Sequence, residues 1–501
     1  MPKPKAFLKQ AKSKQKKEQK LDTVDDFQAA GVDFEEAAGK WRAGDAAKSM
    51  RFFQRAIDVY DQGLQKFPKS VDLAYNKARV QLEIATHPVL VEQLERPQKV
   101  VLEEALASHR YALQLDPDNA DALFNTSQVL TSIAEVMASD EDDEGVEDEA
   151  QALKVLREAL DLQSACLSLQ ERKYQEFLEQ ERIANEQGQE GSEEVPTIPS
   201  TKEGAASGDT EEDSEWFHVV EPVTRDTLID TILAQLGTLT TLCSILSSSP
   251  GVAPAHTFPW VEQFSSSLME KLQTFSSSQP DRLQEIALAK GNLVSAILDA
   301  GYRSGQIDVE TYRRERDSAF ALAELQLEGF IEGLIANARS LMAFNSALAE
   351  SENGDAQSQA TLRWNTLTAS IANLKSASAV PGISQDDLAT THLLRGDASL
   401  YLYAMAFPPT SHPTAVNTAT QNAKNAEVYY RNASRLAPEE EERDIASMKS
   451  AVAQYLQAYS QGQARSDVGD LFNASPRGQE WAVKQLEDMV AENLVPPALF
   501  S

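Results

Sequence analysis

The sequence predicts an all-α fold, a helical-repeat solenoid interrupted by a disordered acidic insertion. One pattern occurs twice: an amphipathic stretch ends at a proline, and a new helix opens with an aromatic-Asn pair, in residues 70–76 and again in residues 119–125. Val, Ile and Thr do not alternate with polar residues over any long segment, so strand signals are nearly missing. Hydrophobic residues make up 42% of the chain but aromatic residues only 7%, which suits a helical protein. Because repeat proteins work through their surfaces, we expect this chain to hold another protein.

Apolar spacing near 3.6 residues predicts six helices in the first third of the chain. Their expected ranges are 26–43, 46–66, 71–86, 98–115, 119–137 and 148–186. The breaks at Pro68 and Pro117 separate them, and the stretch from His87 to Pro97 is an insertion. Residues 140–149 form an acidic run, either a solvated loop or a surface that attracts a basic segment.

A different composition begins after the sixth helix. Residues 187–215 are rich in Glu, Gly, Ser, Thr and Pro, which predicts a disordered acidic linker. Apolar residues 216–220 follow; they dock on the chain's own helices or pair with a partner as a short motif. Helices are then expected at 226–247, 259–275, 279–303, 308–349, 355–377, 384–406, 414–436, 439–461 and 477–494. Asp226 or Thr224 is the expected N-cap of the first of these, and the last is expected to cap the array.

These patterns divide the chain into five regions. They are a basic disordered tail (1–24), a helical-repeat array (25–186), the disordered linker (187–215), a central helical region (216–380) and a second array with a capping helix (381–501).

The repeated segments resemble tetratricopeptide repeats (TPR). The residues that carry the resemblance are Gly44, Ala56, Tyr60, Gly63 and Pro68, then Ala105, Ala112 and Pro117 with His109 in the position of the aromatic, and Tyr430, Ala433 and Pro438. The TPR unit is about 34 residues long, so the spacing from Pro68 to Pro117 implies an insertion of roughly 15 residues. The resemblance covers residues 28–137 and 385–460, and it implies paired helices in an array but no particular activity.

Charge is distributed unevenly. The formal net charge is −31, yet residues 1–20 carry eight lysines and one glutamate. Three interpretations of this tail stay open. It is a nuclear-import signal centred on Lys12, Lys14, Lys16 and Lys17, it contacts nucleic-acid phosphates, or it is a solvated segment without a role. The first interpretation predicts a cytoplasmic and nuclear protein. The acidic remainder of the chain repels nucleic acid and favours a basic protein partner.

The cysteines and the apolar runs indicate which cellular compartment the sequence predicts. Cys166 and Cys243 belong to no CxxC motif, and we expect both to be buried thiols in a reducing compartment. The strongest apolar run, residues 228–246, is interrupted by polar side chains, so no membrane span is expected. The lysine-rich N-terminus has no apolar core of a secretory signal.

Catalytic motifs are missing from the sequence. There is no P-loop, GxGxxG, HExxH or GxSxG pattern, and the six histidines have no ligand spacing. We therefore expect no enzyme, no cofactor and no metal.

One known TPR activity can be compared position by position. TPR cofactors of heat-shock chaperones clamp a C-terminal carboxylate with Lys, Arg and Asn side chains. The positions that align are Trp41, Asp45, Asn76, Asp121 and Asn125, of which only Asn76 matches. Asp45 and Asp121 would repel a carboxylate.

The residues we expect to bind a partner are Tyr75, Asn76, Arg79, Phe124 and Asn125. Two roles stay open for the repeated Asn76 and Asn125: they hydrogen-bond a peptide backbone, or they bond between repeats.

The predicted function is that of a non-enzymatic TPR scaffold or dedicated assembly chaperone. It would hold a basic protein on an acidic concave surface, as TPR chaperones that shield a single basic ribosomal protein do. Two alternatives are a heat-shock-chaperone cofactor that binds a C-terminal peptide, and a scaffold of an RNA-processing complex that uses the tail on RNA.

Overall fold

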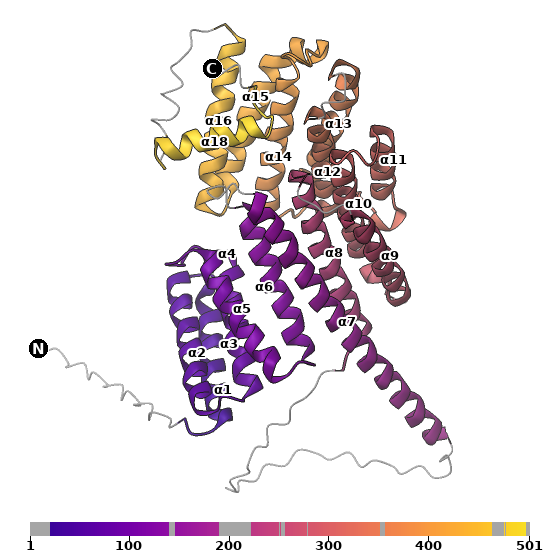
Figure 1. Ribbon diagram of the computed structural model, residues 1–501. Helices are drawn as coiled ribbons and strands as arrows, with labels where there is room; N and C mark the ends of the chain where they lie inside the picture. The colour runs from indigo at the N-terminus through magenta and orange to yellow at the C-terminus, as the bar shows by residue number, and fades with distance from the viewer. Residues whose placement is uncertain are drawn as a thin grey trace, which may run out of the picture. The chain divides into compact units, whose positions relative to one another are not determined.

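The computed structural model describes residues 21–139, 146–189, 222–249, 251, 256–277, 279–350, 356–462, 475 and 477–496. Within these ranges the chain forms α-helices and two short 3-10 helices and contains no strand (Figure 1), which confirms the all-α prediction. The lysine tail, residues 140–145 of the acidic run 140–149, and residues 190–221 lie outside the described residues. Residues 187–189, expected to open the disordered linker, instead continue a helix.

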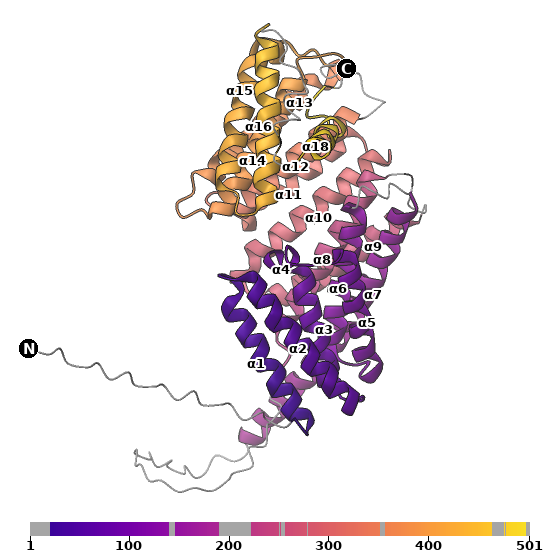
Figure 2. The same ribbon diagram turned by 90° about the vertical axis from the view of Figure 1, so that its left-hand side faces the viewer.

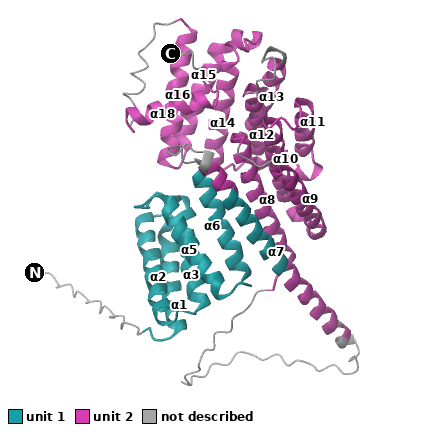
Figure 3. Ribbon diagram, in the orientation of Figure 1, with its two compact units in different colours: residues 1–142, 154–170 teal, residues 143–153, 171–501 magenta. Residues whose placement is uncertain are grey.

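Two compact units make up the chain (Figure 3). Unit 1 comprises Met1–Asp142 and Lys154–Gln170, and unit 2 comprises Asp143–Leu153 and Glu171–Ser501. The division into five regions stays a prediction.

Unit 1 is a series of antiparallel helices in which consecutive long helices pack on one another. The helices are α1 (Val24–Arg42), α2 (Ala46–Lys66), α3 (Val71–Thr86), α4 (Pro88–Val91), α5 (Gln98–Leu115) and α6 (Ala120–Ser139), followed by residues 154–170 of α7 (Val146–Gln189). The expected ranges agree with these bounds to within a few residues. The insertion at 87–97 contains the one-turn helix α4.

Side chains at the expected breaks start these helices. Thr23 accepts a hydrogen bond from the backbone of Asp26 and completes a capping box at α1. Asp45 accepts a hydrogen bond from the Lys48 backbone at α2, and Ser70 accepts one from the Leu73 backbone at α3. Asn119 accepts a hydrogen bond from the Ala122 backbone at 3.0 Å and opens α6. Each cap satisfies a backbone N–H that the helix leaves without a partner.

A glycine and a tyrosine hold α1 against α2. Tyr60 is fully buried, and a Cβ placed on Gly31 would lie 2.3 Å from its ring. Gly63 is similarly enclosed by Leu73 and Phe27. Gly44, one of the residues that carry the TPR resemblance, lies in the turn between α1 and α2 with open space around it. The close approach of the two helices therefore depends on Gly31.

Unit 2 contains the remaining helices. They are α8 (Arg225–Ser248), α9 (Thr257–Ser276), η2 (Pro280–Arg282), α10 (Leu283–Arg303), α11 (Val309–Phe320), η3 (Ala323–Leu325), α12 (Ile331–Glu350), α13 (Ala356–Ser378), α14 (Gln385–Ala404), α15 (Pro413–Leu436), α16 (Glu440–Ser460) and α18 (Gln479–Ala491). Helices α14, α15 and α16 lie side by side (Figures 1 and 2), and α18 adds Ala482, Leu486 and Met489 to their core.

The prediction of one helix over residues 308–349 was wrong. The chain breaks after Phe320, forms η3, and resumes as α12. Leu325 is fully buried in an apolar cluster with Ala287 and Phe320, and Gln326 and Gly329 have left-handed backbones with φ of 42° and 81°. Left-handed residues cannot continue a right-handed helix, so burial of Leu325 outweighs the local preference for helix.

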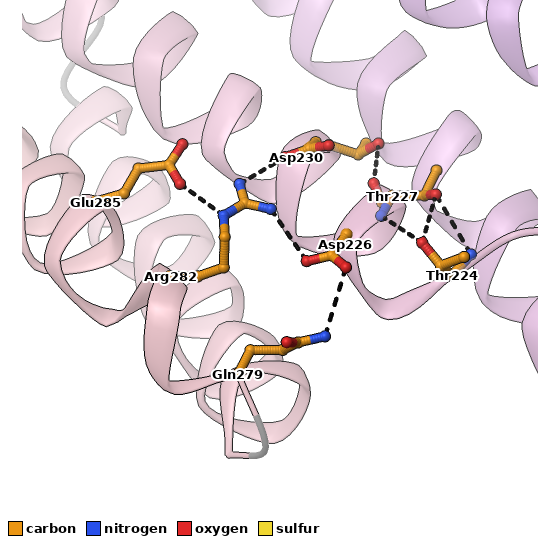
Figure 4. Close-up of polar contacts among 8 residues, drawn as sticks. Thr224, Asp226, Thr227, Asp230, Gln279, Arg282 and Glu285 are labelled. Carbon is orange, nitrogen blue, oxygen red and sulfur yellow. Dashed lines mark hydrogen bonds and ion pairs between the residues drawn. The ribbon is translucent and has the colours of Figure 1, made fainter.

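The start of α8 is fixed by a cap and by a shared arginine. Of the two expected N-caps, Thr224 is the one used, in a capping box with Thr227. Figure 4 shows Arg282 between α8 and α10, where its guanidinium pairs with Asp226 at 3.2 Å, Asp230 at 2.6 Å and Glu285 at 2.6 Å.

Helix α8 also has the length and apolar composition of a membrane span, alone among the described helices, and 61% of that stretch is buried inside the protein. Core helices of globular units pass the same test, and α8 packs on α10. The two cysteines are buried thiols, as expected, and burial raises the pKa of the Cys243 thiol to about 12.

Candidate protein-binding faces of unit 1

The predicted partner-binding residues all lie on α3 and α6 of unit 1. Helix α3 contacts both α1 and α6, so the three helices share one side of the unit. We call this side the α1/α3/α6 face. It includes Glu35 on α1, Asp72, Tyr75, Asn76, Arg79 and Glu83 on α3, and Asp121, Phe124 and Asn125 on α6.

A three-residue network joins α1, α2 and α3 at this face. The Tyr60 hydroxyl donates to Glu35 Oε1 at 2.5 Å, and the Arg79 guanidinium pairs with Glu35 Oε2. Burial opposes the charge on Arg79, but the Glu35 carboxylate outweighs it and raises the pKa of Arg79. Burial, together with Glu35, also raises the pKa of Tyr60, so the phenol remains a donor. Arg79, expected to bind a partner, is thus already held by a carboxylate.

Tyr75 and Asn125 join α3 to α6. Asn125 Nδ2 donates to the Tyr75 hydroxyl at 3.0 Å. Burial and the nearby charge of Asp121 raise the pKa of Tyr75, and Arg79 and Asn125 offset part of this effect. Of the two roles left open for Asn125, the structure displays the bond between helices.

The other two predicted residues are half-buried. Phe124 packs against an apolar cluster that contains Leu123, Cys166 and Leu169, which ties α6 to α7. Asn76 lies one residue after Tyr75 on α3. The predicted import lysines, Lys12, Lys14, Lys16 and Lys17, lie outside the described residues.

The positions that align with a carboxylate clamp have other contacts here. Asp45 accepts a hydrogen bond from the Lys48 backbone as the N-cap of α2. Trp41 is 41% exposed and carries the Lys48 ammonium 3.1 Å above its ring. A clamp needs converging cations and amides, whereas these positions present a carboxylate and an aromatic ring.

Carboxylates outnumber cations on the α1/α3/α6 face. Both guanidinium groups are paired, Arg79 with Glu35 and Arg42 with Glu83. The Asp121 carboxylate lies beyond these pairs and is exposed. The face therefore carries a net negative charge.

The opposite side of α3 lines a groove that was not predicted from the sequence. Its volume is about 670 Å³, and it lies along α2, α3, α5 and the loop after α4. The α3 residues in it are Lys77, Gln81 and Ile84. At about 100° per residue, these lie on the side of α3 opposite to Tyr75, Arg79 and Glu83. The expected insertion at 87–97 was its only sequence signal, because that insertion supplies one wall.

His109 occupies the core between α5 and α3. It is fully buried, and burial lowers its pKa to about 4, an effect offset in part by the Ala78 backbone. Among the described residues, no group of three or more His, Cys, Asp or Glu side chains is arranged to hold a metal ion.

Fold and faces together define an all-helical protein of two units, and comparison with known proteins adds partial relatives. No family model matches the sequence. The chain is 31% identical over 196 residues to UPF0656 protein C926.02 of Schizosaccharomyces pombe, a match that covers 39% of this chain and 41% of that protein. It is 39% identical over 89 residues to uncharacterized protein YNL193W of Saccharomyces cerevisiae, covering 17% of this chain and 16% of that protein. The chain thus matches less than half the length of either relative, and neither name specifies an activity.

Proposed function

We propose that this chain is a non-enzymatic, TPR-like scaffold or dedicated assembly chaperone that holds a basic protein segment on the α1/α3/α6 face. The observation that carries the proposal is the charge of that face. Its guanidinium groups are already paired with Glu35 and Glu83, while the Asp121 carboxylate lies beyond these pairs. A lysine- or arginine-rich segment would meet an excess of carboxylates there.

A repeated arrangement supports the solenoid part of the proposal. Tyr60 packs on Gly31 and donates to Glu35, which pairs with Arg79 of the next helix. Tyr430 on α15 packs on Gly396 of α14 and donates to Asp397 at 2.8 Å, and Asp397 pairs with Lys449 of α16 at 3.0 Å. In both sets the cation follows the tyrosine by 19 residues and the proline follows it by 8.

The repeat is longer than a standard TPR. Helices α1, α3 and α6 begin at residues 24, 71 and 120, so successive hairpins start 47 and 49 residues apart. The TPR unit is about 34 residues. The chain would therefore be a TPR-like array with lengthened helices and an insertion at α4.

The contacts of the face favour binding over catalysis. Its buried tyrosine and its half-buried carboxylate and guanidinium groups bond to one another across α1, α2 and α3. Such a closed network stiffens a surface and leaves its groups engaged. With an import signal in the lysine tail, the protein would carry its partner between cytoplasm and nucleus.

The test is affinity purification of the full chain from native lysate at low and high salt, followed by mass spectrometry. One dominant basic protein, lost at high salt, would support the proposal, and a ribosomal protein would identify its class. A heat-shock chaperone retained at high salt would overturn it in favour of a cofactor role. RNA crosslinks that disappear when residues 1–20 are deleted would instead favour an RNA-processing scaffold.

A further inference from the structure

The groove behind α3 has the form of a peptide-binding trough. Helices α2 and α5 both pack on α3 and flank its outer side. Met50, Ile57 and Leu64 line it from α2, and Ala107 and Tyr111 line it from α5. The loop after α4, residues 93–96, supplies a further wall. A second hollow of about 410 Å³ shares Asp61, Lys77, Ala107 and Ser108 with the first, so the trough is continuous.

Its length suits a short extended peptide. The α2 residues that line it run from Met50 to Gln65. At about 1.5 Å per helical residue this distance is roughly 22 Å. A strand advances about 3.3 Å per residue, so the trough accommodates about six or seven residues.

Its floor is apolar with one unsatisfied acceptor. Ile57, Ile84 and Val101 are buried there. Gln81 Oε1 is also buried, and no described residue donates a hydrogen bond to it. Most buried polar atoms have such a partner, and a rotation of the half-buried Gln81 side chain towards the trough would bring this oxygen to a donor that arrives with a ligand. A backbone N–H of an extended peptide supplies one while apolar side chains cover the isoleucines.

Its charges are balanced. Lys77 pairs with Asp61 at 2.6 Å, and the two terminal guanidinium nitrogens of Arg96 donate to the Glu104 carboxylate. Arg51 and Glu95 also line the trough and cancel each other in formal charge. Unlike the α1/α3/α6 face, the trough has no excess charge to attract a basic segment.

We propose that this trough binds an extended segment of a partner protein that has low net charge, presents apolar side chains to Ile57 and Ile84, and donates a backbone N–H to Gln81 Oε1. The chain then has two binding faces on opposite sides of α3, one for a basic segment and one for a nearly neutral segment. It would join two proteins rather than shield one.

The experiment is selection of a random-peptide display library on the full chain, followed by affinity measurements with the selected peptide. Ala107 is exposed on α5 within the trough, so Ala107→Trp fills the trough without altering the core. Val100→Trp is the matched control, because Val100 is 37% exposed on the same helix and does not line the trough. Gln81→Leu removes the acceptor and keeps the size of the side chain.

We expect apolar peptides of low net charge whose affinity falls more than about tenfold in Ala107→Trp and about tenfold in Gln81→Leu. Val100→Trp should change the affinity for the same peptides by less than about twofold. Failure to select any sequence would overturn the proposal, as would peptides that bind Ala107→Trp normally. Selection of lysine-rich peptides that no longer bind the Asp121→Lys variant would also overturn the proposal. That result would assign peptide binding to the α1/α3/α6 face alone.

Discussion

The ring of Tyr60 lies directly against Gly31, so close that a Cβ on this glycine would sit 2.3 Å from two ring carbons. Tyr60 cannot move aside, because it is fully buried and its hydroxyl is bonded to Glu35. Gly396 and Tyr430 show the same relationship in unit 2, with a Cβ 2.4 Å from the ring. Close approach of paired helices therefore has the same physical basis in both units.

Replacing Gly31 by Ala should loosen α1 from α2. Overpacking of this kind costs about 1–3 kcal/mol, and hydrogen exchange of the α1 and α2 amides should accelerate accordingly. The matched control is Gly39→Ala in the same helix, where the new Cβ meets nothing within 4 Å. That change should stabilise α1 by about 0.5–1 kcal/mol, since alanine is the better helix former. Equal effects of the two substitutions would contradict the assigned contact.

Asp397 should be essential for burying Lys449. The Lys449 side chain is 13% exposed and lies 3.0 Å from Asp397. Burial opposes its charge, yet Asp397 and Glu492 raise its pKa, so it stays protonated. Asp397→Asn leaves a buried ammonium poorly paired and should cost about 3 kcal/mol, measured by hydrogen exchange over α14–α16. Adding Lys449→Met should recover most of the loss; an additive double variant would show that the pair is not coupled.

The protein should lose stability in mild acid through His109. The folded-state pKa is about 4, below the ordinary value of 6.5, so between these pH values the unfolded chain binds a proton that the folded chain excludes. Stability from this group is complete above pH 6.5 and falls by about 3 kcal/mol as the pH drops to 4. His109→Phe should remove this part of the pH dependence in thermal unfolding. His256→Phe, at an exposed histidine, should leave the pH dependence of unfolding unchanged. If His109→Phe also leaves it unchanged, His109 is not the group responsible.

Sequence patterns predicted the local structure of this chain better than its long-range contacts. The cap at Thr224, one of two expected, and the helix end before Pro68 depend on neighbouring residues, and both were predicted. The break within 308–349 was not, because it depends on burial of Leu325 against α10. Gly31 was missed because the ring that leaves no room for a Cβ there belongs to Tyr60, 29 residues further along the chain.

The two proposed binding faces also differ in how far local sequence patterns could predict them. The residues Tyr75, Asn76, Phe124 and Asn125 were found from a repeated motif, and α3 and α6 bring them to one side. The bond from Asn125 to Tyr75 spans 50 positions and has no local signature. The trough takes its walls from α2, α5 and the loop after α4, which only the packing on α3 brings together.

The charge of the α1/α3/α6 face can be tested at Asp121, which is exposed on α6. Asp121→Lys should weaken binding of the basic partner about three- to tenfold at low salt and flatten its salt dependence, because it removes one carboxylate and adds one cation. Asp118 is the matched control, since it is exposed in the turn before α6, outside the face. Asp118→Lys makes the same change in net charge, so it should reduce affinity less than twofold if the face itself binds the partner. Affinity measured against salt for both variants separates local from overall electrostatics, and equal losses in the two would show that net charge, not this face, attracts the partner.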